Sequence, residues 1–185
     1  MQDPDYHATI AKVRTLEIDT EDEKGLIDYL ENIRIQHPSA IIVPSSLPQA
    51  AEGLQQKLGT NYEIVVLEYD ANVLTESDHT PPEAKQSFCV VGRRGGVVFI
   101  PMNSLANVEV SLAHELGHIH LHITALEKGE LENFQKKSIL EIEKAVDGVV
   151  LQLCGFHKTE GWLKTLLPYR DREHFSERIL TLTTS

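Results

Sequence analysis

The sequence predicts an α+β fold in which a small twisted sheet packs against several helices. Two kinds of segment support this class. Long stretches contain apolar residues at helical spacing, and short runs rich in Val, Ile and Tyr are bounded by Pro or Gly, as strands are. The chain has 185 residues, of which 41% are hydrophobic. This length is enough to bury one substantial core, so we expect a single domain over residues 1–185.

The N-terminal part, residues 1–86, is expected to contain both helices and strands. A helix is predicted at 21–35, because Thr20 and Glu23 have the spacing of a capping box and Leu and Ile follow at helical spacing. A short buried strand is predicted at 40–43, where an apolar run is ended by a proline.

A second helix is expected next, with Ser45 or Ser46 as its N-cap and Gly59 as its stop. Residues 62–69 have the composition and length of a strand. Residues 70–86 are polar and contain two consecutive prolines, which predicts a long loop. Beside a cleft such a loop would gate substrate, and elsewhere it would be a plain connector.

A β-hairpin is predicted at 87–100, with a Gly-rich turn at 92–96 between its two strands. The second strand leads into a helix expected from 105 to 123, which contains no proline and has Asn103 or Ser104 as a candidate cap. If that second strand lies at the edge of the sheet, its backbone would offer a bound peptide an extra strand position.

The last part of the chain is expected to be helical. A long helix is predicted at 134–154, because apolar residues recur on one side of it and Gly155 follows. Residues 155–185 are then a helical C-terminal extension, in which Pro168 ends one short amphipathic helix.

The segment His114-Glu115-Leu116-Gly117-His118 carries the most specific chemistry of the sequence. Residues at i and i+4 lie on one face of a helix, about 5–6 Å apart, so His114 and His118 are expected to bind one metal ion. Glu115 lies one position further round the helix, where a general base would reach a water on catalytic zinc. The opposing interpretation is a helix that carries these histidines without binding a metal.

Catalytic zinc usually takes three protein ligands, so a third is needed. Glu143 is the preferred candidate, because Asp147 follows it at i+4 and would accept the free ring N–H of a metal-bound histidine. Glu141 is the rival ligand, and a solvated acidic face is the alternative for all three carboxylates. His122 lies about 12 Å along the helix from His114 and is not expected to share its metal.

Composition restricts the possible partners. The formal net charge is −11 and there is no long basic cluster, so direct binding of nucleic acid is not expected, whereas a basic protein is a suitable partner. Signal-peptide features and a membrane-spanning run are not apparent, which indicates a cytoplasmic protein. Cys89 and Cys154 are expected to be small buried hydrophobic residues, not a disulfide or a metal pair.

Three segments of the chain together resemble the ImmA/IrrE family of zinc metallopeptidases. They are the block from Val97 to Asn103, the helix segment from Val110 to His122, and the later Glu143-Lys144-Ala145-Val146-Asp147. The resemblance covers residues 87–154, which would form the metal-binding core, and implies a compact gluzincin-like fold. It implies that His114, His118 and a downstream Glu hold Zn²⁺ and that Glu115 is the base. It further implies cytosolic proteolysis of helix-turn-helix repressors of mobile elements or stress regulons.

Three functions therefore remain for testing. The first is a zinc-dependent endopeptidase that hydrolyses a peptide bond in a regulatory protein, in particular a DNA-binding repressor. The second is a zinc-stabilised module that binds and sequesters a repressor or antitoxin without cutting it. The third is a general peptidase without a dedicated substrate. Manganese or iron would suit the same types of ligand.

Overall fold

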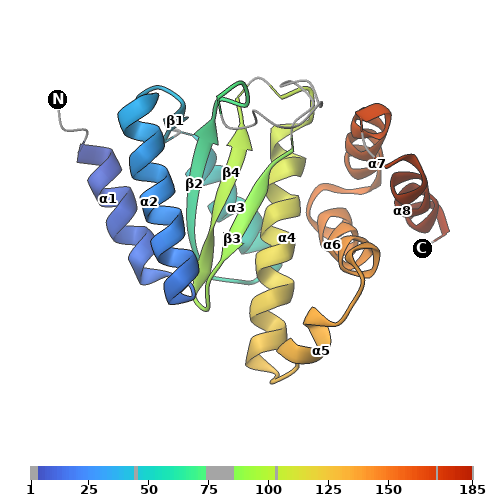
Figure 1. The fold of residues 1–185 in the computed structure, drawn as a ribbon. Coiled ribbons are helices and arrows are strands. Elements are labelled where there is room, and N and C mark those ends of the chain that lie inside the picture. Colours follow the sequence, from blue (N-terminus) through green and yellow to red (C-terminus); the bar gives the residue numbers. More distant parts are fainter. Residues whose placement is uncertain (1–3, 44–45, 74–85, 103, 170, 185) are drawn as a thin grey trace.

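The computed structural model describes residues 4–43, 46–73, 86–102, 104–169 and 171–184, and it has the predicted α+β class (Figure 1). The strands are β1 (Ile41–Ile42), β2 (Glu63–Tyr69), β3 (Phe88–Val91) and β4 (Gly95–Pro101). The helices are α1 (Pro4–Thr15), α2 (Thr20–Gln36), α3 (Leu47–Leu58), α4 (Val108–Glu127), α5 (Leu131–Gln135), α6 (Ile139–Cys154), α7 (Phe156–Leu166) and α8 (Arg172–Thr184), with a 3₁₀ turn at Leu167–Tyr169. Among the described helices, none combines the length and the apolar composition that crossing a bilayer requires.

The four described strands form one mixed sheet in the order β1-β2-β4-β3. β2 and β4 are parallel, with Val66 opposite Val98, whereas β1 and β3 are antiparallel to their neighbours. The second hairpin strand, β4, is therefore interior, whereas β1 and β3 lie at the two edges of the described sheet. The physical reason is that every residue of β4 is buried, and a strand that is apolar on both faces needs cover on both sides.

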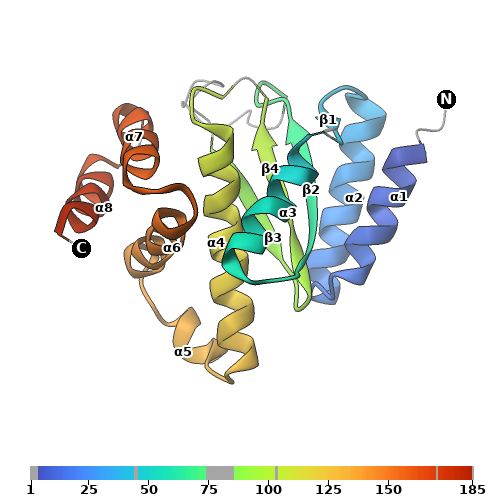
Figure 2. The same cartoon turned by 180° about the vertical axis from the view of Figure 1, so that it is seen from behind.

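Alternate residues of β4 face two separate hydrophobic clusters. Val97 and Phe99 pack with the apolar residues of α1 and α2 on one side of the sheet. Val98 and Ile100 belong to the larger cluster with α3, α4, α6, α7 and α8 on the other side. Figures 1 and 2 show these two layers of helices on either side of the sheet.

α4 is the central helix of the larger cluster, and α6 packs against it (Figure 2). The two helices meet at Gly117, where an added Cβ would lie 2.9 Å from Cγ1 of Val146. This distance is shorter than real Cβ contacts allow, so the absence of a side chain at Gly117 brings α6 close to the two histidines.

Several predicted helix boundaries are wrong, because the residues that cap these helices differ from the predicted ones. Asp19, not Thr20, caps α2, and its side chain accepts a hydrogen bond from the backbone N of Glu21. α4 begins later than predicted, because Asn107 accepts from the backbone N of Val110 at 3.2 Å. Asn107 therefore takes the capping role assigned to Asn103 or Ser104.

The predicted helix at 134–154 is two helices, α5 and α6. Ser138 caps α6 through a capping box: its hydroxyl accepts from the backbone N of Glu141, and the Glu141 carboxylate accepts from the backbone N of Ser138. The strand predicted at 62–69 and the α3 stop at Gly59 are confirmed, and Gly59 has the expected left-handed conformation. The strand predicted at 40–43 is present as β1, but it covers only Ile41–Ile42 and is not buried, because it lies at an edge of the sheet, where Ile42 is 43% exposed. Most of the loop predicted at 70–86 lies outside the described residues.

Candidate metal centre

α4 brings His114 and His118 together one helical turn apart. Their Nε2 atoms are 3.2 Å from each other, and their rings meet edge to face. His114 is buried and His118 is partly buried, because the face of α4 that carries them is covered by α6 and α7. The pair is arranged as the i, i+4 spacing predicts.

α6 adds Glu143 to this pair. Its Oε2 atom lies 3.3 Å from Nε2 of His114, and its Oε1 atom lies 3.2 Å from Nε2 of His118. Tetrahedral zinc with bonds of about 2.0–2.1 Å separates its ligand atoms by about 3.3–3.4 Å. The two histidine nitrogens are separated by nearly this distance, and each lies within 3.3 Å of a different oxygen of Glu143, so the three side chains converge on one point. A buried group that could hold a metal ion is present, formed by His114, His118 and Glu143.

The charge states of His114 and Glu143 suit metal binding. Burial lowers the pKa of His114 to about 3, so this imidazole is neutral at pH 7. Burial works to raise the pKa of Glu143, but the hydrogen bond from His118 and the nearby positive charges lower this pKa to about 2, so the carboxylate is ionised. Burial works to lower the pKa of His118, but its hydrogen bond to Glu143 together with the negative charges of Glu115 and Glu143 raises this pKa.

Glu115 lies at the same site on the β3 side. It is only 3% exposed, and its Oε1 atom accepts a hydrogen bond of 2.7 Å from the hydroxyl of Ser87. Burial raises the pKa of Glu115, while His118, Ser87 and the thiol of Cys89 act to lower it. A carboxylate of raised pKa is a better proton acceptor than an ordinary one, as a general base requires.

A cavity of about 470 Å³ opens in front of these residues. Its walls include the candidate ligands, Glu115 and the first residues of β3, and an apolar side formed by Phe134, Ile139 and Ile142. A carbonyl group in this cavity would therefore be close both to a metal ion and to the Glu115 carboxylate.

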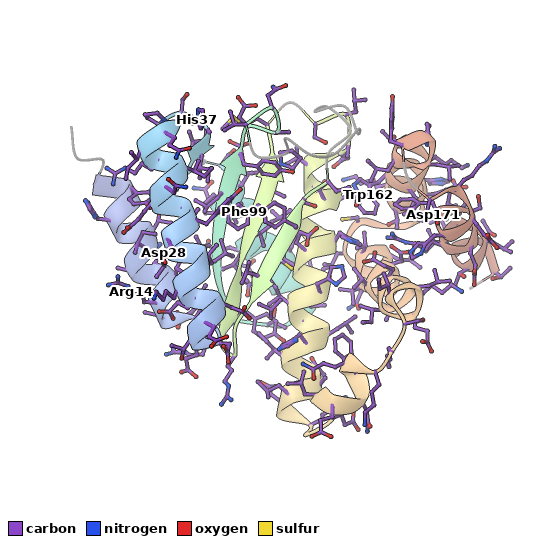
Figure 3. All side chains as sticks on the ribbon, viewed as in Figure 1. Arg14, Asp28, His37, Phe99, Trp162 and Asp171 are labelled. Atoms are coloured by element: carbon purple, nitrogen blue, oxygen red, sulfur yellow. The ribbon has the colours of Figure 1, made fainter. Side chains whose placement is uncertain are left out.

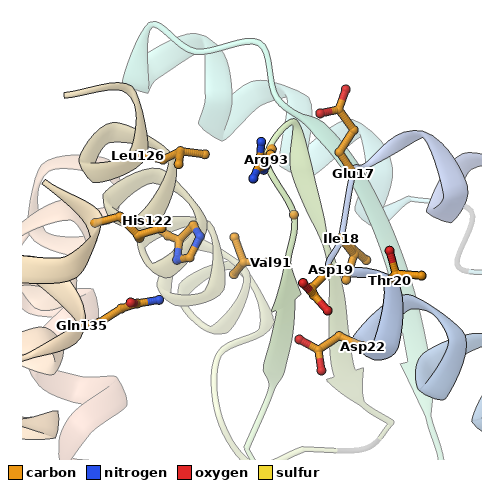
Figure 4. A pocket seen from close by; sticks show the side chains of 12 residues that line it. Glu17, Ile18, Asp19, Thr20, Asp22, Val91, Arg93, His122, Leu126 and Gln135 are labelled. Atoms are coloured by element: carbon orange, nitrogen blue, oxygen red, sulfur yellow. The ribbon is translucent and has the colours of Figure 1, made fainter. Parts of the chain in front are cut away.

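A second cavity of about 540 Å³ lies next to the first, and Val91 and His122 line both. Figure 4 shows His122 on the α4 side of this second cavity and the carboxylates of Asp19 and Asp22 on the α2 side. The two cavities follow the edge strand β3, so the space beside the candidate ligands continues along the sheet edge.

Asp147 does not play the predicted role. Among the described residues, both of its carboxylate oxygens accept hydrogen bonds from Arg178 of α8, each of 2.7 Å. Nδ1 of His114 is buried and has no hydrogen-bond partner in the described part of the chain. The prediction that Asp147 accepts from a histidine ring failed because it left out a cation that arrives from a distant helix.

Glu141, the rival ligand, is exposed and points away from the site. Its carboxylate takes part in the capping box of Ser138, which accounts for an acid at that position. His122 lies further along the cavity and is not in the ligand group, as expected. His120 instead contacts the hydroxyl of Tyr62 through Nδ1 at 2.9 Å.

Trp162 of α7 covers the back of His114. The two ring centroids are 4.8 Å apart, and the indole N–H donates a hydrogen bond of 3.0 Å to the hydroxyl of Ser111. Figure 3 marks Trp162 on α7, beside α4. This contact restricts the His114 ring from the side opposite the cavity.

Three features of the site were missed in the sequence. Ser138 and Glu141 have the capping-box spacing, and this signal would have excluded Glu141 as a ligand. Ser87 and Arg178 carry no comparable signal, because their partners Glu115 and Asp147 are far away in the chain.

Comparisons of this chain with models of protein families, with curated proteins and with solved structures found no match.

Proposed function

We propose that the protein is a zinc-dependent endopeptidase with a zincin-like core that hydrolyses a peptide bond in a regulatory protein. His114, His118 and Glu143 hold the metal, and Glu115 is the general base. A helix-turn-helix repressor is the substrate that the resemblance to ImmA/IrrE peptidases implies.

The observation that carries this proposal is the ligand triangle. In this triangle of three side chains the two histidine nitrogens are 3.2 Å apart, and each lies 3.2 or 3.3 Å from a different oxygen of Glu143, close to the ligand spacing of tetrahedral zinc. The triangle lies at the wall of a cavity that also contains Glu115. A structural zinc site is closed by four protein ligands, whereas a catalytic one keeps a position open. Three protein ligands beside an open cavity and a carboxylate favour the catalytic type.

Bound zinc would supply a Lewis acid for the scissile carbonyl and lower the pKa of a water molecule to about 7. Glu115 accepts the proton of that water on its carboxylate and donates it to the nitrogen of the leaving amine. Ser87 donates to Oε1 of Glu115, which holds the carboxylate in one orientation. Burial of Glu115 keeps bulk water from competing for this proton.

The edge strand supports a peptide as the substrate. β3 pairs with β4 on one side, and its Phe88 and Cys89 line the cavity that contains the candidate ligands. An extended peptide beside β3 would gain backbone hydrogen bonds and pass in front of Glu115. The formal charge of −11 favours encounter with a basic protein, as DNA-binding proteins are.

The test combines metal content with proteolysis. Elemental analysis of the purified wild type is expected to give about one zinc per chain. The protein is then incubated with a panel of purified helix-turn-helix repressors and with unfolded casein, and cleavage is followed by mass spectrometry. We expect cleavage of a repressor and little cleavage of casein. Equal cleavage of both would indicate a general peptidase.

Glu115→Gln separates catalysis from sequestration. It removes the proton acceptor but keeps the size of the side chain, so we expect zinc content to stay and the cleavage rate to fall by about 10²- to 10⁴-fold. A repressor that binds wild type and Glu115→Gln equally well and is cut by neither would contradict the peptidase and identify a sequestering module. Wild type that holds no metal after zinc is supplied would contradict both.

A further inference from the structure

A buried arginine lies directly behind the candidate metal ligands. Arg178 of α8 is only 2% exposed, and its guanidinium lies 4.9 Å from the ring of Phe175 and 5.8 Å from the ring of Trp162. Burial of a cation is costly unless it is paired and hydrogen-bonded. The partners of Arg178 therefore indicate why it is there.

In the described structure, the polar contacts of Arg178 are with two carboxylates of α6. Nε and Nη2 donate to the two oxygens of Asp147 at 2.7 Å, which is the bidentate geometry that fixes the plane of a guanidinium. Nη1 then lies 3.0 Å from Oε2 of Glu143. Asp147 balances the charge of Arg178, so the pair contacts Glu143 without removing the negative charge that a metal needs.

The contact matters because a glutamate carboxylate is not oriented by its own chain. Rotation about the last bond of Glu is broad, so a neighbour must select the orientation. The other contacts of Glu143 in the described structure are with His114 and His118, and a metal ion would lie between those atoms. Arg178 contacts Oε2 of Glu143 and is not itself a candidate ligand, so it is the described partner that is able to orient this carboxylate.

We propose that Arg178 is a positioning residue of the metal centre. It orients the Glu143 carboxylate towards the histidines, and it couples the docking of α8 to metal affinity. The inference rests on the metal site of the proposed function but not on the peptidase reaction. Partners of this kind behind metal ligands typically change metal affinity by about 10- to 100-fold when they are removed.

Two variants test the role of Arg178. Arg178→Lys keeps the charge but is unable to donate to Asp147 in a fork and to Glu143 at the same time. The double variant Arg178→Met with Asp147→Leu replaces the buried ion pair by apolar side chains, a change that folded proteins often tolerate without loss of stability. It removes the contact to Glu143 and leaves no unpaired charge.

The chain offers a matched control. Glu177, next to Arg178 on α8, forms an exposed ion pair with Lys144, next to Glu143 on α6. Glu177→Gln therefore breaks another contact between the same two helices without touching the metal ligands. If only helix docking matters, this control and the Arg178 variants will behave alike.

Zinc affinity is measured by competition with a chromophoric chelator, and ligand geometry by the visible absorption spectrum of the Co²⁺-substituted protein. We expect both Arg178 variants to bind zinc about 10- to 100-fold more weakly and to have an altered Co²⁺ spectrum. Glu177→Gln is expected to match wild type in both. Wild-type affinity and spectrum in the folded Arg178 variants would contradict the positioning role while leaving the proposed function intact.

A measurement on wild type covers the case in which the variants do not fold. Coupling is reciprocal, so zinc must favour docking of α8 as much as docked α8 favours zinc. We expect zinc to slow amide hydrogen exchange in α8, whereas local exchange in α1, on the opposite face of the sheet, stays unchanged. Exchange in α8 that zinc does not alter would overturn the proposal. Loss of peptidase activity alone would not affect it.

Discussion

At the scale of single residues, two of the three candidate ligands are oriented by neighbours on other helices. Trp162 packs against the ring of His114, and Arg178 contacts the carboxylate of Glu143. His118 is the more exposed of the two histidines and depends mainly on its place on α4. The local sequence around the motif therefore supplies the ligand atoms, while residues of α7 and α8 supply their orientation.

Glu141 and Glu143 make a matched pair for a prediction at this scale. Glu143→Ala removes one corner of the ligand triangle, so we expect zinc binding to be lost. Glu141→Ala removes one half of the capping box with Ser138, so we expect zinc content to be kept and the free energy of unfolding to fall slightly.

Metal content is measured by elemental analysis and stability by urea unfolding. Trp162, the one tryptophan of the chain, packs against the ring of His114 and provides a fluorescence signal for zinc titration. Loss of zinc in Glu141→Ala, with full retention in Glu143→Ala, would reverse the assignment.

At the scale of elements, the contact between α4 and α6 decides whether the third ligand reaches the histidines. Gly117 lies within the motif, and Val146 lies on α6 between Glu143 and Val149. Because Val146 is fully buried and stiff, it is unable to move aside for a new side chain. A larger residue at 117 would therefore displace α6 and its carboxylate together.

Gly117→Ala tests this close approach. We expect a net fall in the free energy of unfolding of about 1 kcal/mol, because overpacking costs more than the alanine gains as a better helix former. We also expect weaker zinc binding, since Glu143 moves away from its partners.

Gly148→Ala on α6 is the control, because an added Cβ there meets nothing within 4 Å. In this variant we expect unfolding to become harder by about 0.5–1 kcal/mol, with zinc affinity unchanged. Chemical denaturation and zinc titration give both quantities. Equal behaviour of the two variants would show that helix packing does not control the site.

At the scale of the whole molecule, a metal ion would join two helices of the larger hydrophobic cluster. α4 contributes two ligands and α6 one, and both helices pack in the core shared with α7 and α8. A ligand that binds only the native state stabilises it by about 2.7 kcal/mol at a hundred times its dissociation constant. Metal binding is therefore expected to raise the stability of the fold as a whole.

Removal of the metal has a measurable consequence. For a domain of this size, that stabilisation corresponds to a rise of about 5–10 °C in Tm. We expect dialysis against a chelator to lower Tm by this amount and zinc to restore it, as followed by circular dichroism. His118→Ala is the control, and its Tm is expected to be insensitive to both treatments. A wild-type Tm unaffected by chelator and zinc would contradict a metal-stabilised fold.

The local sequence pattern was sufficient to predict the histidine pair and the main helices and strands of this protein. The i, i+4 spacing placed His114 and His118 on one face, and the main helices and strands followed from periodicity and from stops such as Gly59. These features depend on residues within one or two turns of each other, so their interactions are present in the sequence window itself. The capping box of Ser138 belongs to the same class, and it excludes Glu141 for a local reason.

Long-range packing decided the rest. β3 rather than β4 is the edge strand, because β4 is covered on both faces by helices from distant parts of the chain. Arg178 binds Asp147 and contacts Glu143 only because α8 folds back against α6. Such contacts depend on how whole elements pack, which no short window of sequence contains. The two histidines could thus be identified from the helix alone, whereas the support of the third ligand required the assembled core.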